Sequence, residues 1–174
     1  MGTAAGFCMQ GIKTISIGYY AGANSQGEGA IAIGTSAGIS DQSNDTIAIG
    51  TNAGCNSQGG AAIAIGGAAG CNSRGGAAIA IGGAAGTSTQ GANSIAIGSN
   101  AGSNDQGDYA IAIGDEAGKT SQRNFSIAIG NQAGSNNQEA TTIAIGSTRE
   151  KLPKKPIQSL SDLTQGKLTN LLSQ

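Results

Sequence analysis

A unit of 16 residues repeats without insertion or deletion along most of this 174-residue chain. Each copy contains Ile-Ala-Ile-Gly, or Ile-Ser-Ile-Gly in the first copy, and an Ala-Gly pair begins four residues after the second Ile. Because an insertion would shift later copies out of line, a constant period indicates that the copies stack in one pose. The two Ile of the nine copies are Ile15, Ile17, Ile31, Ile33, Ile47, Ile49, Ile63, Ile65, Ile79, Ile81, Ile95, Ile97, Ile111, Ile113, Ile127, Ile129, Ile143 and Ile145.

The repeat predicts strands rather than helices. Sixteen residues are too few for a helix-pair repeat, which takes about 33 or more. Gly recurs at least twice per copy, and each Gly costs about 1 kcal/mol relative to Ala inside a helix. Ile-x-Ile alternation has the period of a strand, and the Gly, Asn and Ser between the Ile pairs are turn residues. We therefore expect an all-β fold, a parallel β-roll or β-solenoid of nine 16-residue coils over residues 1–146, with a second short strand in each coil.

Small side chains are expected to fill the inside of the coil. Aromatic residues make up only 3 % of the chain, and much of its 38 % hydrophobic fraction is Ala. A 16-residue coil encloses a narrow lumen, and neighbours along a strand point to opposite faces. Columns of Ala, Ser and Thr are therefore predicted to line the lumen, with both Ile columns pointing outward. The alternative is a monomer whose lumen is filled by Ile.

Outward Ile columns would form an apolar stripe larger than a monomer normally exposes. Burying an Ile side chain contributes about 1.5–3 kcal/mol, so covering the stripe would contribute tens of kcal/mol. The pattern predicts a homotrimer of parallel copies, with all 18 Ile at the oligomer interface.

Three further columns follow the same period. The Gly after each Ile pair and the Gly of each Ala-Gly pair indicate turns with positive φ or close backbone approach. An Asn, Ser or Thr column is interpreted as turn chemistry: Asn24, Ser40, Asn56, Asn72, Ser88, Asn104, Thr120 and Asn136. A Gln column with Arg74 as its one substitution predicts a stacked amide ladder, with bonds across subunits as the alternative: Gln10, Gln26, Gln42, Gln58, Gln90, Gln106, Gln122 and Gln138.

The strings Ser94-Ile95-Ala96-Ile97-Gly98-Ser99-Asn100-Ala101 and Ser126-Ile127-Ala128-Ile129-Gly130-Asn131-Gln132-Ala133 resemble the head repeat of YadA-type trimeric autotransporter adhesins. The resemblance covers residues 1–146 and implies a trimer of left-handed β-rolls that binds host surfaces. The repeat of that family is slightly shorter. We see no signal peptide at Met1–Gln10, no coiled-coil stalk and no membrane anchor. Similar repeats occur in viral and phage fibres made in a reducing cytosol, which is the expected setting, with an excised fragment as the alternative.

The chain offers little for catalysis or for cofactor and metal binding. It has no His, and we find no Ser or Cys with a plausible base partner, so no catalytic residue, cofactor or metal is predicted. A net charge of −1 and the absence of a long apolar run argue against nucleic acid and a membrane span. Cys55 and Cys71 lie one coil apart, at a spacing that a disulfide allows, but an inert pair of thiols is expected.

The period stops after Gly146. Residues 147–158 form a basic linker with two Pro, and residues 159–174 are predicted to form an amphipathic helix. Its apolar face includes the candidate docking residues Leu160, Leu168, Leu171 and Leu172. The helix would either cap or bundle the trimer, or dock into another protein such as a capsid or fibre protein.

The sequence therefore favours a structural or adhesive module of a fibre, spike or surface adhesin, expected to be viral. Such a module would be made without a signal peptide and would act on a virion or cell surface, where a host glycan or protein is the expected ligand. If the rod binds a ligand, we expect it at the aromatic and charged ends, which contain Tyr19, Tyr20, Tyr109 and Phe125; the alternative is that these are scattered solvated side chains. The alternative is a cement or spacer protein in a capsid-like assembly, docked through its C-terminal tail.

Overall fold

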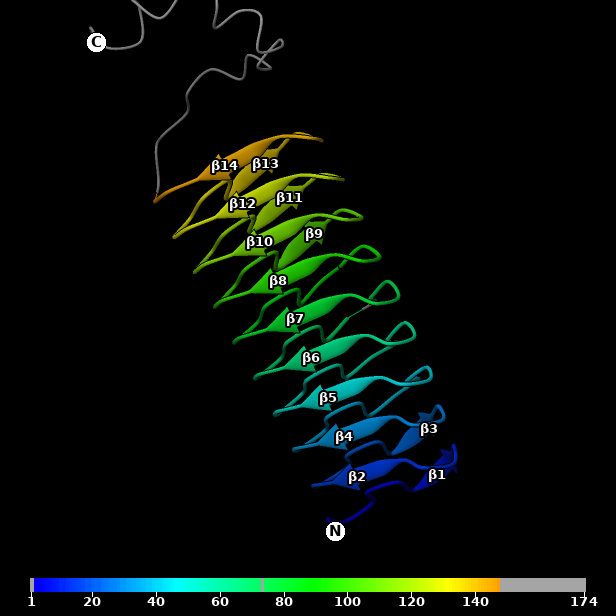
Figure 1. Cartoon of the computed structure of the whole chain (residues 1–174). Coiled ribbons are helices and arrows are strands. Elements are labelled where there is room, and N and C mark those ends of the chain that lie inside the picture. Colours follow the sequence, from blue (N-terminus) through cyan, green and yellow to red (C-terminus); the bar gives the residue numbers. More distant parts are fainter. Residues whose placement is uncertain (1, 73, 148–174) are drawn as a thin grey trace, which may run out of the picture.

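The computed structural model describes residues 2–72 and 74–147, which form a straight rod of stacked coils (Figure 1). One side of the rod is a nine-stranded parallel sheet in which every strand pairs with the strand one repeat away. Ile lies opposite Ile and the central residue opposite its counterpart throughout, as in Ile63–Ile79 and Ala64–Ala80. The strands are β2 (Ile15–Ile17), β4 (Ile31–Ile33), β5 (Ile47–Ile49), β6 (Ile63–Ile65), β7 (Ile79–Ile81), β8 (Ile95–Ile97), β10 (Ile111–Ile113), β12 (Ile127–Ile129) and β14 (Ile143–Ile145).

A second, less continuous ladder runs along another side of the rod. Its strands are β1 (Cys8–Gln10), β3 (Asn24–Gln26), β9 (Asn104–Gln106), β11 (Thr120–Gln122) and β13 (Asn136–Gln138). Between β3 and β9 the same column continues as single parallel bridges from one coil to the next. The predicted all-β parallel solenoid of about nine coils is therefore confirmed, whereas the second short strand forms only in the coils toward the two ends. The predictions for residues 148–174, including the helix and its four Leu, lie outside the described residues.

Ala side chains form the apolar core. The central Ala of β4, β5, β6, β7, β8, β10 and β12 and the Ala of the Ala-Gly pairs make one continuous cluster along the lumen. Its buried members have no exposed surface except Ala133, which is 5 % exposed. The small residue before the Ile pair, such as Ala78 or Ser94, is also fully buried in every coil except the first and the last, where Thr14 and Thr142 are half-buried. The lumen is thus as narrow as the sequence predicts, and the expectation that small columns line it is confirmed.

The fold requires Gly after each Ile pair for two reasons. Gly66 has φ near +128°, a conformation that L side chains rarely adopt. A Cβ on Gly66 would lie 2.5 Å from the carbonyl oxygen of Gly82 in the next coil. The same two constraints recur from Gly18 to Gly130, which explains why this column never varies in the chain.

The Gln column points into the lumen rather than toward another subunit. Gln90, Gln106 and Gln122 are each at most 2 % exposed. The side-chain Nε2 of Gln106 donates to the carbonyl oxygen of Ile95 across the lumen at 2.7 Å, and to the Oε1 of Gln122 in the next coil at 3.3 Å. Burial inside the coil rules out the alternative of bonds across subunits.

The interpretation of the Asn, Ser and Thr column as turn chemistry is wrong for the members that lie in strands. The members that lie at bends are Ser40, Asn56, Asn72 and Ser88. Asn24, Asn104 and Asn136 lie in strands and are exposed. Members of the column stack with their neighbours, as where Asn56 Nδ2 donates to Asn72 Oδ1 at 3.0 Å. The column therefore forms a polar outer ladder on the second side of the rod.

Candidate functional site

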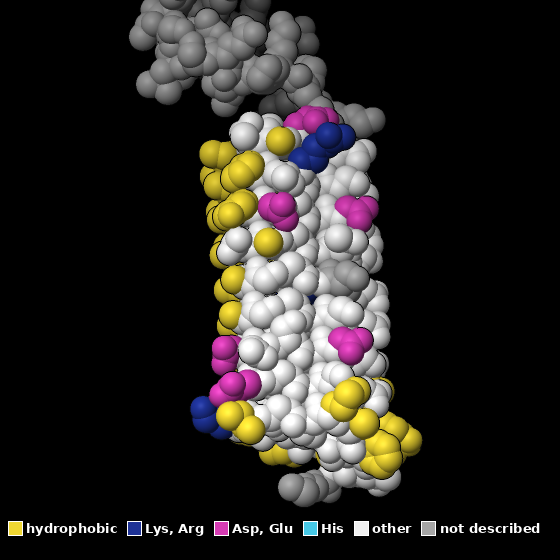
Figure 2. All heavy atoms as spheres, turned by 90° about the vertical axis from the view of Figure 1, so that its right-hand side faces the viewer, with side chains coloured by type: hydrophobic (Ala, Val, Ile, Leu, Met, Phe, Trp, Pro, Cys, Tyr) yellow, Lys and Arg dark blue, Asp and Glu magenta, His cyan; other side chains and the backbone are white. Residues whose placement is uncertain are grey.

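The strongest candidate site is the isoleucine face, the outer surface formed by the 18 Ile of the nine-stranded sheet. In each strand the residue between the two Ile faces the lumen, so both Ile point outward. The parallel register places each Ile directly over the Ile of the neighbouring coil. Figure 2 shows hydrophobic side chains along the upper part of one edge of the rod, with charged side chains below them on the same edge. The structure thus brings all the sequence-predicted interface residues onto one surface, and the Ile-filled lumen is excluded.

This face leaves much apolar surface in contact with solvent. Ile81, Ile97 and Ile113 are each exposed by more than a third, although they lie well inside the rod. At the C-terminal end the exposure rises to 67 % for Ile143 and 75 % for Ile145. Nine rungs at about 4.8 Å make a stripe roughly 43 Å long and about 10 Å wide. An area of about 430 Å² is as large as the largest apolar patch of a typical monomer, about 300–600 Å², and such patches often mark interaction surfaces.

The turns that border the isoleucine face differ between the middle and the ends of the rod. Beside β6 and β7 they contain Gly67 and Gly83, around which a Cβ would meet no atom within 4 Å. Neither residue has a positive φ. Since the coil itself requires no glycine at either position, the small size of these residues serves no purpose in the packing of one chain.

The exposed ion pairs lie toward the ends of the described rod. Lys13 pairs with Glu28 at 3.2 Å, and Lys119 with Glu116 at 2.7 Å. The hydrogen bond and positive charge of Lys119 hold the pKa of Glu116 below its ordinary value. These pairs are partly or largely solvent-exposed, so they contribute little to stability. The middle of the isoleucine face is left without a charge of its own.

Two exposed aromatic rings stack on adjacent coils near the C-terminal end. The ring centroids of Tyr109 and Phe125 are 5.2 Å apart with nearly parallel planes, and the two residues are 53 % and 57 % exposed. This contact was not predicted from the sequence, although the 16-residue spacing of Tyr109 and Phe125 places them on adjacent coils. A shallow depression nearby is lined by residues that include Asp108, Arg123 and Asn124.

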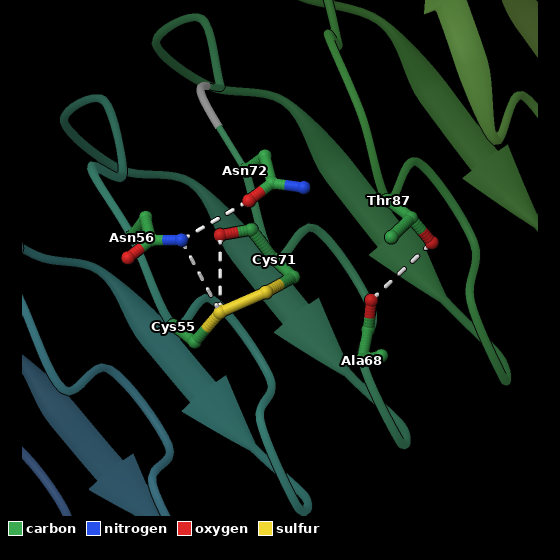
Figure 3. Close-up of a disulfide and its surroundings, with 6 residues drawn as sticks. All are labelled: Cys55, Asn56, Ala68, Cys71, Asn72 and Thr87. Carbon is green, nitrogen blue, oxygen red and sulfur yellow. Dashed lines mark hydrogen bonds between the residues drawn. A yellow bond between two sulfur atoms is a disulfide. The ribbon is translucent and has the colours of Figure 1, made fainter.

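The expectation of two inert thiols is wrong. Cys55 and Cys71 form a disulfide between successive coils, with their Cα atoms 4.7 Å apart (Figure 3). Figure 3 also shows Asn56 bonded to Asn72 beside it. The one-coil spacing indicated that the bond was possible, but spacing alone does not decide the oxidation state. Cys8 is free and exposed.

Within the described ranges, no helix is long and apolar enough to cross a membrane. No group of three or more His, Cys, Asp or Glu among the described residues could hold a metal ion. Comparisons with protein families, with characterised proteins and with solved structures gave no match.

Proposed function

We propose that the chain is a trimeric β-roll module of a fibre, spike or surface adhesin, in which three parallel rods meet through their isoleucine faces. This proposal rests on one observation. Two uninterrupted columns of Ile point outward from a straight sheet whose strands are in register. A flat apolar stripe along the whole rod is best covered by an equally long and equally regular surface. A second and third copy of the same rod supply that surface, and three parallel copies bury all Ile at once.

The bordering glycines support the same arrangement. Gly67 and Gly83 lie beside the middle of the isoleucine face, and their small size is not needed by the fold of one chain. Small residues let two backbones approach closely. Close approach in the middle of the rods, where no ion pairs intervene, would bring the Ile columns of neighbouring copies into van der Waals contact.

The surface away from the Ile would carry the adhesive role. The aromatic pair Tyr109–Phe125 is exposed and adjoins a depression with charged and amide side chains. Exposed aromatic rings beside polar groups suit a ligand with both apolar and hydroxyl-rich surfaces, and a host glycan is the ligand we propose. The module would thus act on a virion or cell surface.

Binding of the full chain to immobilised host-cell glycans tests the adhesive part of this proposal. The informative variant is Tyr109→Asn with Phe125→Asn, because Asn93 already occupies the same column with the same left-handed φ of 56°. We expect the wild type to be retained and the double variant to lose binding at least tenfold. Tyr19→Ser with Tyr20→Ser, at the other end of the rod, is the matched control.

Equal retention of the wild type and the Tyr109/Phe125 variant would contradict the adhesive role of this pair. Retention by purified capsid but by no glycan would instead favour the alternative of a cement or spacer protein docked through residues 147–174. The trimer itself is tested separately by the mass measurement that closes the Discussion.

A further inference from the structure

Arg74 is the one cationic side chain inside the lumen of the described rod. It occupies a position of the Gln column and is only 6 % exposed. Its Nε donates to the Oε1 of Gln90 at 3.0 Å, and its Nη2 to the carbonyl oxygen of Ala78 at 2.7 Å. Its Nη1 is fully buried and has no hydrogen-bond partner among the described residues. The two oxygens that accept hydrogen bonds from Arg74 are neutral, so neither balances the positive charge of its guanidinium group.

The charge of Arg74 is uncompensated within the described part of the chain. The ion pairs found there all involve other residues, at the surface. Burial lowers the pKa of Arg74 to about 10, which still leaves the side chain protonated near neutral pH. An isolated buried charge is very costly, and in folded proteins such charges are paired.

A second unsatisfied donor lies next to it. Gln58 pairs with Arg74 in the backbone ladder one coil away and is 2 % exposed. Neither its Nε2 nor its Oε1 has a hydrogen-bond partner. The Nε2 of Gln26 and of Gln42 also lacks a partner, so what distinguishes Gln58 is its place next to Arg74.

The glycines of two Ala-Gly pairs show where Gln58 Nε2 and Arg74 Nη1 lie. Gln58 Nε2 is 1.3 Å from the place that a Cβ on Gly54 would take, and Arg74 Nη1 is 2.8 Å from the equivalent place on Gly70. Gly54 and Gly70 are one coil apart, and coils are spaced by about 4.8 Å. The two donors therefore lie in adjacent coils of the same column inside the lumen.

We propose that Arg74 Nη1 and Gln58 Nε2 hold a small monovalent anion of the halide class in the lumen, with chloride as the natural ligand. The surrounding lumen is narrow and lined by Ala such as Ala64 and Ala80. The Ala-lined lumen favours a small anion over sulfate or phosphate. A water molecule in the same place would leave the guanidinium charge unbalanced. The inference does not depend on the trimer or on adhesion.

Bromide substitution tests this site directly. Crystals of the full chain grown in bromide should show an anomalous peak within about 3.5 Å of both nitrogens, the outer limit of a halide hydrogen bond. The matched control is Arg74→Gln, which restores the residue found in the rest of the column and should fold normally. The peak should be absent from Arg74→Gln. No peak in the wild type, a neutral water in its place, or the same peak in Arg74→Gln would overturn the proposal.

A solution measurement gives an independent answer. A ligand that binds only the folded state stabilises it with increasing concentration. Replacing sulfate by chloride at constant ionic strength should therefore raise the melting temperature of the wild type by about 3 °C or more relative to Arg74→Gln, on the usual scale for chains of this size. Because general salt effects act on both proteins, only this difference counts, and equal responses of the two would contradict anion binding.

Discussion

The isoleucine face and the Gln column reverse the usual distribution of side chains. The 18 Ile lie on the outside of the rod, whereas amide side chains such as Gln90 and Gln122 are among its most completely buried residues. The difference follows from the size of the coil. Its lumen is too narrow for Ile columns, and it contains strand carbonyls that an amide can reach, as Gln122 reaches Ile111 at 2.8 Å. Folding of one chain therefore depends on small and hydrogen-bonding side chains, and its apolar residues are left for contacts between chains.

The largest expected effect comes from placing a charge on the isoleucine face. Ile79→Asp at mid-rod would bury three carboxylates near the axis of the proposed trimer, at several kcal/mol each. We expect assembly to be abolished while the coils remain folded, as measured by sedimentation velocity and circular dichroism. Ser57→Asp is the control, because it lies exposed in a column that already contains Asp41 and Asp105. Normal assembly of Ile79→Asp would remove Ile79 from the interface.

The disulfide should stabilise the coils without affecting the contact between chains. Replacing both Cys55 and Cys71 by Ser opens a loop of 16 residues and should lower the free energy of unfolding by about 3 kcal/mol. Urea denaturation measures this loss, and the mass of the assembly should not change. Cys8→Ser, at the free cysteine, is the control and should have no effect. Equal stability of the double variant and the wild type would mean that the disulfide does not contribute.

A smaller effect on stability or assembly is expected when an apolar residue replaces a Gln in the lumen, or a Gln replaces an Ile of the isoleucine face. Gln106→Leu leaves the carbonyl oxygens of Ile95 and Ala110 without their side-chain donor, which should cost about 2 kcal/mol of folding stability. Ile97→Gln, on the outer face of the neighbouring strand β8, should instead leave folding nearly unchanged and weaken assembly. If Gln106→Leu is as stable as the wild type, the lumen does not require its amides.

Removing Lys151–Gln174 should have the smallest effect on the coils. Each coil of a solenoid contacts only its neighbours, and the hydrogen bonds of the described rod connect residues up to Gly146. We expect the circular dichroism of the truncated chain to match that of the full chain, with only attachment to a partner lost. Failure to fold would identify the tail as the clamp that starts trimer formation.

Much of this fold could be predicted because the Ile-x-Ile strands are regular. Their two-residue alternation correctly separates an Ala-lined lumen from an outer Ile face. The same rule fails in the second strand, where Asn104 is exposed but Gln106 is buried. The residue between them, Asp105, has φ near +53°, which rotates the chain so that residues two apart point to opposite sides. No sequence signal marks that backbone conformation, because Ser and Asn also occupy the position.

Arg74 illustrates a second limit. The sequence identifies it as the one departure from the Gln column, but only the buried position shows that its charge lacks a partner. An exposed Arg in the same column would have been an ordinary surface substitution. Likewise, the 16-residue spacing of Cys55 and Cys71 places the sulfurs close together without indicating whether they are bonded.

The central claim is that the isoleucine face is covered by copies of the same chain. Multi-angle light scattering of the full chain at micromolar concentration measures this most directly, because it gives the mass without assuming a shape. The account predicts three times the 16.8 kDa of one chain, unchanged over a tenfold dilution. A mass of one chain, with the coils folded, would contradict it.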